Sequence, residues 1–297
     1  MLWLVAIIIA YFLFSITSLG DKFLLIGAPS PKTYAFYVGI LGISMLLLVP
    51  FVGFGVPGLF EIIFCLFTGV IYLIAIFSIY QGLEYFEATR VIPTIGALVP
   101  IFTFGFIYAF SGGREMLGLR EIIAFIIFIL GGLLISYTPG KKIISESLKI
   151  SAIGALFLAL MFVLSKYIYL NIPFWVGFLW IRIGTFLAAL TFLFMKEVRQ
   201  DLFGKKHVFG AKTGSLFIAN QIVGAGGFIL QSWSISLAPL ALLSIINALQ
   251  GIQYLFLFVF TVMFYRFFKE KMTKRIVIQK IAAIVLIIIG FIVLGVL

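Results

Sequence analysis

The chain has 297 residues, of which 64% are hydrophobic and only 10% are charged, and its formal net charge is +11. An ordinary soluble domain carries about 25% charged residues, and a soluble protein of this size could not bury so much apolar surface. The composition therefore excludes a soluble enzyme and a disordered chain and predicts a polytopic membrane protein. The basic residues lie in short connections beside apolar segments, which favours the positive-inside pattern over nucleic-acid binding.

Charged residues divide the chain into apolar segments that can each cross a bilayer, since a spanning helix needs about 20 residues. The first segment lacks a basic leader and an A-x-A site, so we expect a span in place of a cleaved signal peptide. The uncharged run 213–265 is too long for one crossing, and we expect it to divide at Ala238-Pro239. The predicted spans are 2–24, 33–50, 59–81, 88–110, 119–137, 147–170, 174–195, 213–236, 239–265 and 276–296.

The second half of the chain repeats features of the first half in the same order. The matching pairs are Lys22 with Lys166, Pro29 with Pro173, Ala88 with Ala238, Arg114-Glu115 with Lys269-Glu270, Ala124 with Ala283 and Gly131 with Gly290. Each half holds five predicted spans, and an odd number makes the second half enter the membrane from the opposite side. We therefore predict an all-α polytopic membrane protein with ten transmembrane helices. They form two inverted-topology five-helix repeats, 1–141 and 142–297, an arrangement typical of secondary transporters.

Three features of the sequence resemble the EamA-type branch of the drug/metabolite transporter superfamily. They are EATRVIPTIGALVPIFTF in the fourth span, FVLSKYIYLNIPFWVGFLWIRIG across the sixth and seventh spans, and a glutamate motif after spans four and nine, GGREML and FFKEKMT. EamA-type proteins often carry a serine-lysine near the end of each repeat's first helix and an arginine early in the second helix. The second repeat keeps both as Lys166 and Arg182, whereas the first keeps Lys22 but has FYV at residues 36–38 in place of the arginine.

The resemblance covers nearly the whole chain and implies a function. It implies a multi-pass protein of the cell (inner or plasma) membrane that moves small organic metabolites, such as amino acids or related solutes, by alternating access. Its partners would be a small-molecule solute and membrane lipids, without nucleic acid, in a monomer or homodimer. A flippase for lipids or lipid-linked precursors is the alternative, because the many phenylalanines suit a hydrophobic substrate as well as a lipid-facing surface.

Polar side chains inside the spans are costly in hydrocarbon unless they face a cavity or another helix. In the first and eighth spans they recur at helical spacing and so share one face of each helix. Such a stripe either lines a solute path or joins packed helices by hydrogen bonds. The candidate substrate-binding residues are Tyr11, Ser15, Ser18, Tyr72, Gln81, Asn220, Gln231, Asn247, Gln250 and Tyr254.

Lys22, Lys166 and Arg182 are candidates for anion binding or for a structural role. Arg182 is the one basic residue well inside a predicted span. There its guanidinium could bind a carboxylate or phosphate through two hydrogen bonds, or pair with helix-end carbonyls. We expect the structural role for Arg182 and solvation at the membrane interface for both lysines.

Several kinds of chemistry are absent from the sequence. The single histidine, His207, and the single cysteine, Cys65, cannot build a zinc site, and no phosphate-binding glycine loop or H-E-x-x-H motif occurs. We therefore expect no enzyme, no catalytic residues, no metal and no cofactor. No Asp or Glu lies in the middle of a predicted span, although proton-coupled antiporters usually carry one there. We expect transport without obligatory proton coupling.

The distribution of lysine and arginine predicts an orientation. Most of these residues outside the spans lie in connections that follow odd-numbered spans, including 196–212 and 266–275. The positive-inside rule places those connections in the cytoplasm and both termini outside. EamA-type proteins are often described with both termini inside, so the charge distribution and the resemblance differ on orientation.

Overall fold

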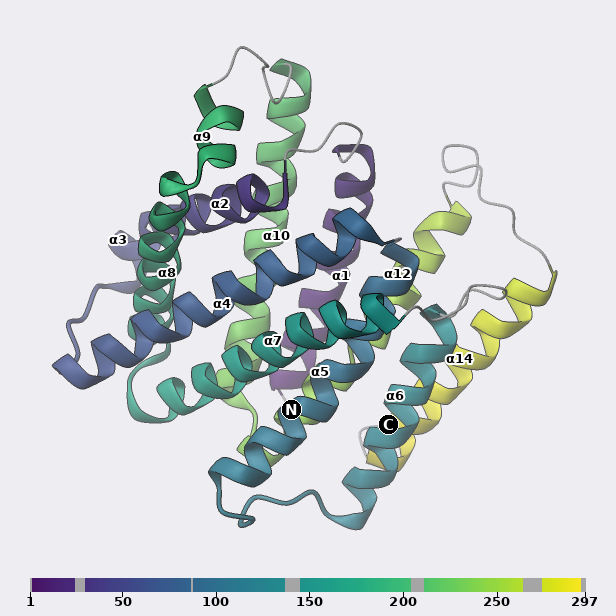
Figure 1. Cartoon of the computed structure of the whole chain (residues 1–297). Helices are drawn as coiled ribbons and strands as arrows, with labels where there is room; N and C mark the ends of the chain where they lie inside the picture. Colours follow the sequence, from purple (N-terminus) through teal and green to yellow (C-terminus); the bar gives the residue numbers. More distant parts are fainter. Residues whose placement is uncertain are drawn as a thin grey trace.

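The computed structural model describes residues 2–24, 30–86, 88–136, 145–203, 211–263 and 274–294. These ranges hold helices joined by turns and contain no strand (Figure 1). Six helical segments among them are long and apolar enough to cross a membrane, and two further apolar helices are shorter. The predicted all-α class of membrane protein is confirmed at this level.

Helices occupy the positions of all the predicted spans in both halves. The first half contains α1 (Leu2–Leu24), α2 (Pro31–Gly42), which a 3-10 turn connects to α3 (Val49–Val52), then α4 (Leu59–Tyr85), α5 (Ala88–Phe110) and α6 (Leu119–Ser136). The second half contains α7 (Ser145–Asn171), α8 (Phe174–Thr191), α9 (Lys196–Phe203), α10 (Ala211–Leu237), α11 (Leu243–Ala248), α12 (Gly251–Met263) and α14 (Lys274–Leu294). The predicted boundary between the halves, at residues 141 and 142, lies outside the described residues.

The predicted break at Ala238-Pro239 is confirmed, since α10 ends at Leu237 and a 3-10 turn starts at Leu240. The predicted span 239–265 corresponds to one candidate membrane span, Leu240–Phe260, which contains a 3-10 turn and parts of two helices, α11 and α12, in place of one continuous helix. A close approach to α6 lies at their junction. A Cβ atom added to Gly251 would lie 3.1 Å from the Cα atom of Gly132. The two backbones approach closely, and a side chain at Gly251 would require the helices to move slightly apart.

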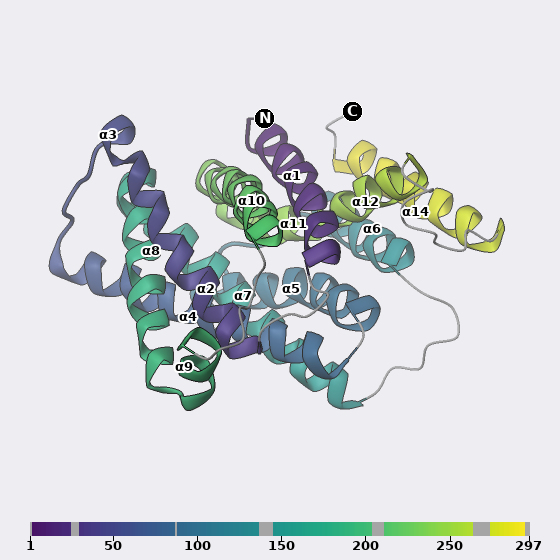
Figure 2. The same cartoon turned by 90° about the horizontal axis from the view of Figure 1, so that it is seen from above.

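Helices from one half pack along helices from the other. The most extensive contacts join α1 to α10, α4 to α7 and α6 to α14, and these pairs lie side by side in Figures 1 and 2. The first helix of each half therefore packs on the helix at the third predicted span of the other half. The last helices of the two halves pack on each other.

The contact between α6 and α14 is reciprocal. A Cβ atom added to Gly131 would lie 2.9 Å from Ile287, and one added to Gly290 would lie 2.6 Å from the ring of Phe128. The two glycines differ in number by 159 (290 minus 131), and so do the two side chains that cover them (287 minus 128). Equivalent residues of the two predicted repeats thus make equivalent contacts.

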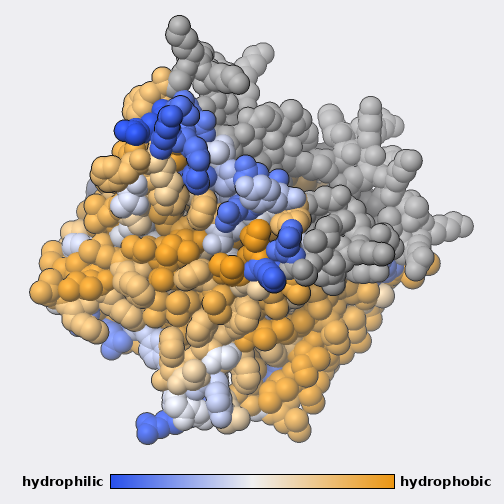
Figure 3. Space-filling model, in the orientation of Figure 1, coloured by the Kyte–Doolittle hydropathy of each residue, from blue (hydrophilic) through white to orange (hydrophobic). Residues whose placement is uncertain are grey.

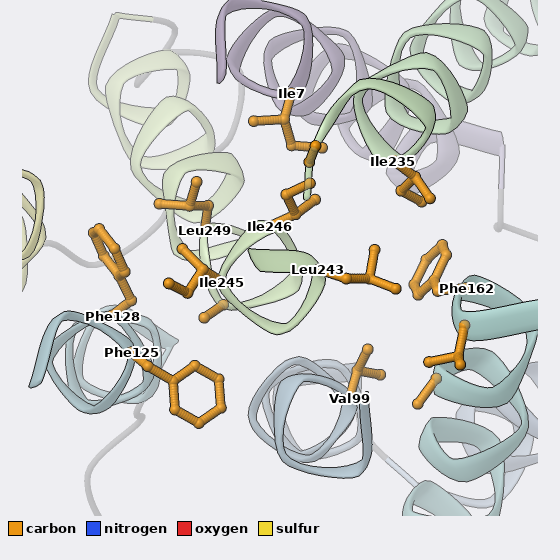
Figure 4. Close-up of a cluster of buried hydrophobic side chains, with 14 of the residues drawn as sticks. Ile7, Val99, Phe125, Phe128, Phe162, Ile235, Leu243, Ile245, Ile246 and Leu249 are labelled. Carbon is orange, nitrogen blue, oxygen red and sulfur yellow. The ribbon is translucent and has the colours of Figure 1, made fainter. Parts of the chain in front are cut away.

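The short helix α11 lies in an apolar core. All six of its residues are buried. In Figure 4, Ile246 lies toward Ile7 of α1, Leu243 toward Phe162 of α7, and Ile245 toward α6. Side chains from both halves thus pack around α11, and the polar groups described below lie around this core.

The outer surface carries a broad hydrophobic band. Figure 3 shows hydrophobic residues across most of one face, with hydrophilic residues toward its upper and lower margins. Large apolar side chains such as Phe60, Ile126 and Ile288 are exposed. A soluble monomer rarely exposes so large an apolar area, whereas a lipid-facing surface requires it.

Candidate solute-binding site

Tyr11 joins three helices near the centre of the protein. Its buried hydroxyl donates a hydrogen bond of 2.9 Å to the carbonyl oxygen of Ile246 in α11. Gln250 donates its backbone N–H to Asn247 instead of Ile246, so the Ile246 carbonyl is not used by its own helix. The side chain of Gln231 in α10 lies within hydrogen-bonding reach of the Tyr11 hydroxyl. The structure therefore brings Tyr11 and Gln231 together beside the carbonyl end of α11.

Polar groups of α1, α10 and α12 meet along the same side of α1. Ser15 and Ser18 donate to carbonyls of their own helix, while the Asn220 amide donates to the Thr17 carbonyl at 3.2 Å. The amide of Gln253 donates to the Ser18 hydroxyl at 3.2 Å. Gln253 was not among the predicted residues, although its spacing from Gln250 and Tyr254 offered a signal. The side chain of Lys22 lies outside the described residues.

Asn247 forms a second link between the halves. Its Nδ2 atom donates to the Thr103 hydroxyl of α5 at 2.9 Å, and both residues are buried. Its Oδ1 atom has no hydrogen-bond partner among the described residues. An unused acceptor beside a hydroxyl is a group that can hold a solute donor or a water molecule.

A small pocket lies between α5, α6 and the junction of α11 and α12. It is lined by Gly96, Ala97, Phe128, Ile129, Gly132, Leu133, Ala248, Gly251 and Tyr254. The Tyr254 hydroxyl donates to the Ile92 carbonyl at 3.3 Å. A Cβ atom at Gly96 would lie 2.8 Å from that hydroxyl and 3.5 Å from Oε1 of Gln250. Glycine at position 96 thus lets both predicted polar groups approach α5.

The structure separates two predicted residues of α4 from this group. Gln81 lies near the C-terminal end of α4, and no helix of the pocket packs extensively on α4. Tyr72 lies further from the end of α4 and belongs to a different cluster, around Arg182.

Arg182 is buried among aromatic rings. Only 4% of the surface of Arg182 is exposed. The guanidinium carbon lies 3.6 Å from the ring centroid of Phe228 in α10, 4.8 Å from that of Tyr72 in α4 and 5.4 Å from that of Phe178 in α8. These distances are within the range of cation–π attraction, so three helices share one cation.

The hydrogen-bond donors of Arg182 are only partly used. Its Nε and Nη2 atoms are buried and have no hydrogen-bond partner in the described part of the chain. The described residues include no acidic side chain within salt-bridge distance of this guanidinium. The sequence singled out Arg182 and Tyr72 but not Phe178 and Phe228, because phenylalanine occurs 35 times and its positions carry no distinguishing pattern.

Lys166 has a structural contact, and the expectation that water solvates it at the interface is wrong. Its residue is 2% exposed, and Nζ donates to the Ser236 carbonyl at 2.9 Å. Ser236 is in the last turn of α10, where carbonyls lack partners within the helix. The lysine therefore satisfies a helix end inside the protein.

No family model and no curated protein matches the sequence. A crystal structure of another protein superposes on this chain with a TM-score of 0.71, covering 97% of this chain and 96% of the other at 15% sequence identity. At that identity the similarity shows a shared fold over the whole chain.

Proposed function

We propose that this protein is an EamA-type carrier of the drug/metabolite transporter superfamily. In this proposal ten spans form two inverted five-helix repeats in the cell membrane. They move small organic metabolites by alternating access and without obligatory proton coupling. The protein carries out no covalent chemistry and needs no cofactor, and its partners are the solute and the surrounding lipids.

The observation that carries the proposal is the reciprocal packing of the two halves. Gly131 and Gly290, and the residues that cover them, keep the same separation along the chain. In the pairs α1 with α10 and α4 with α7, the first helix of one half packs on the helix at the third predicted span of the other half. Inverted repeats place a binding site at the interface between halves, where each half can rock against the other.

The position of the polar groups supports a solute path at this interface. Tyr11 comes from the first half, whereas Gln231, Asn247 and Tyr254 come from the second. Hydroxyls and amides can orient a solute by hydrogen bonds on both sides of such a path.

Transport by the purified protein in lipid vesicles tests the proposal. A panel of labelled amino acids and related metabolites is offered to protein-containing and empty vesicles, and initial uptake rates are compared. We expect at least one solute to enter faster with protein. We expect Gly96→Leu to reduce that rate severalfold, because its side chain would occupy the space beside Tyr254 and Gln250. Gly105→Leu is the matched control, since a Cβ atom there meets nothing within 4 Å.

The same vesicles separate the carrier from the flippase. A fluorescent phospholipid and an impermeant quencher report lipid movement between leaflets. Accelerated lipid movement without uptake of any solute in the panel would overturn the carrier proposal and favour the flippase.

A further inference from the structure

The two unpartnered nitrogens of Arg182 form one edge of its guanidinium. Nε and Nη2 point their N–H groups in parallel directions along that edge, which is the geometry that accepts both oxygens of a carboxylate. The rings of Phe228, Tyr72 and Phe178 surround the guanidinium at 3.6 to 5.4 Å. Among the residues that the structure describes, no acceptor lies on this edge.

A buried cation with two unused donors is costly, even though the Tyr72 side chain lies within hydrogen-bonding reach of the guanidinium. Removing a charge from water requires pairing and hydrogen bonds in return, and cation–π contacts supply only part of that stabilisation. The sequence places no Asp or Glu in the middle of any apolar segment, so an internal counter-ion is not available at this depth. A charged residue at membrane depth that lacks an internal counter-ion points to an external one.

We propose that the Nε–Nη2 edge of Arg182 binds the carboxylate of a small organic monoanion whose body is aromatic or apolar. A single negative charge compensates the guanidinium and leaves the site neutral, whereas a phosphate dianion would leave a net charge buried. The rings of Tyr72, Phe178 and Phe228 make the surroundings of the guanidinium apolar, which favours an apolar body for the ligand. This inference rests on the proposed function, because it assigns the carboxylate to the solute that the carrier moves.

The other explanation of the same geometry is a purely structural clamp. In that case Arg182 holds α8 against α4 and α10 through the rings alone, and no anion is needed. The two explanations differ in one measurable property. Only a binding site makes the stability of the protein depend on a carboxylate through the edge of Arg182.

Thermal unfolding of the purified full-length protein in neutral detergent distinguishes them. Sodium benzoate is titrated as the probe, with the neutral isostere benzamide, inorganic phosphate and sodium chloride in parallel. We expect benzoate to raise the Tm saturably and the other three to leave it unchanged. Arg182→Lys keeps the charge but cannot form two parallel bonds, and we expect it to weaken benzoate binding at least about tenfold, since one bond to a charged group is lost.

Two further variants complete the test. Arg182→Gln should abolish the response to benzoate, and Arg182→Lys answers the question if Arg182→Gln does not fold. Arg120→Gln is the matched control, because Arg120 is exposed and donates to the Val293 carbonyl at the end of α14. We expect it to respond to benzoate as the unmodified protein does.

Three outcomes would overturn the assignment: no stabilisation of the unmodified protein by benzoate, equal stabilisation of the Arg182 variants, or stabilisation by phosphate in place of benzoate. Failure of the site and failure of the carrier are distinguishable. Benzoate binding through Arg182 in a protein that moves no solute would overturn only the proposed transport. Uptake of solutes by a protein that does not bind benzoate would overturn only the carboxylate site.

Discussion

Single buried hydroxyl and amide groups link the helices of this protein. Tyr11 is the clearest case, because its one hydroxyl connects α1 to the carbonyl end of α11 across the two halves. We predict that Tyr11→Phe lowers the free energy of unfolding by about 1 kcal/mol, since it removes a buried hydrogen bond and changes the shape little. Unfolding in mixed detergent and SDS micelles measures the change. Tyr85→Phe, at a residue that is 65% exposed, should have no effect. Equal stability of Tyr11→Phe and the unmodified protein would contradict the importance of this bond.

The polar stripes could be read from the sequence because helical spacing fixes which residues share a face. Spacing does not determine what the face meets. Asn220 was predicted from its stripe, but its partner, the Thr17 carbonyl, is a backbone group with no sequence signal. Lys166 likewise could be placed near the end of its helix, yet only the fold brings the Ser236 carbonyl to it.

Glycine positions determine how closely the helices approach. At the crossing of α4 and α8, a Cβ atom added to Gly184 would lie 2.6 Å from the Cα atom and the carbonyl oxygen of Leu66. Backbone atoms cannot rotate away as a side chain can, so we predict that Gly184→Ala destabilises the protein by about 1–3 kcal/mol. The same unfolding titration measures it.

Gly105→Ala is the control for this prediction. It lies within α5, and an added Cβ atom there meets nothing within 4 Å. Alanine favours helix over glycine, so this variant should be neutral or more stable by up to about 1 kcal/mol. Equal stability of the two variants would show that close packing at Gly184 does not determine how closely α4 and α8 approach.

Helix positions were predictable because runs of apolar residues between charges are long and regular. The break between α11 and α12 was not predictable in this way, because it occurs inside an uncharged run. At this break Gly251 approaches Gly132, a contact between residues far apart in sequence. Charge spacing along the chain carries no signal for a contact of that kind.

The orientation of the whole molecule in the membrane follows from which connections share a side. Asp201 of α9 accepts hydrogen bonds from Ser30 and Thr33 at the start of α2. The connections after the first and seventh predicted spans therefore meet on one side, as an alternating path through ten spans requires. These connections are rich in lysine and arginine, and we predict that they face the cytoplasm.

Cysteine labelling in intact cells checks this orientation, starting from a Cys65→Ser background. Met116→Cys, in the exposed turn after α5, should react with a membrane-impermeant thiol reagent, whereas Gln200→Cys in α9 should react only after the membrane is opened. The reverse pattern would invert the orientation. Labelling of both positions from the same side would contradict the alternating ten-span topology.

Coupling to protons is a property of the entire path across the membrane. An ionised carboxylate at membrane depth is expensive and normally persists only for a function, of which proton exchange is one. This chain has no Asp or Glu in the middle of an apolar segment, and His207 lies between α9 and α10, outside the described residues. The polar groups around Tyr11 and Asn247 are hydroxyls and amides, which bind solutes by hydrogen bonds and do not exchange protons near neutral pH.

We therefore predict that the initial rate of solute uptake into vesicles is the same with and without a pH gradient. The membrane potential must be held at zero with potassium and valinomycin, because a carboxylate solute carries charge. A membrane potential would change the free energy of its transfer by about 2.3 kcal/mol per 100 mV. The solute must also be one whose charge does not change over the pH range used. Accumulation against a concentration gradient, driven by the pH gradient and abolished by an uncoupler, would contradict the prediction. It would then require a titrating group, which the polar hydroxyls and amides described here do not supply.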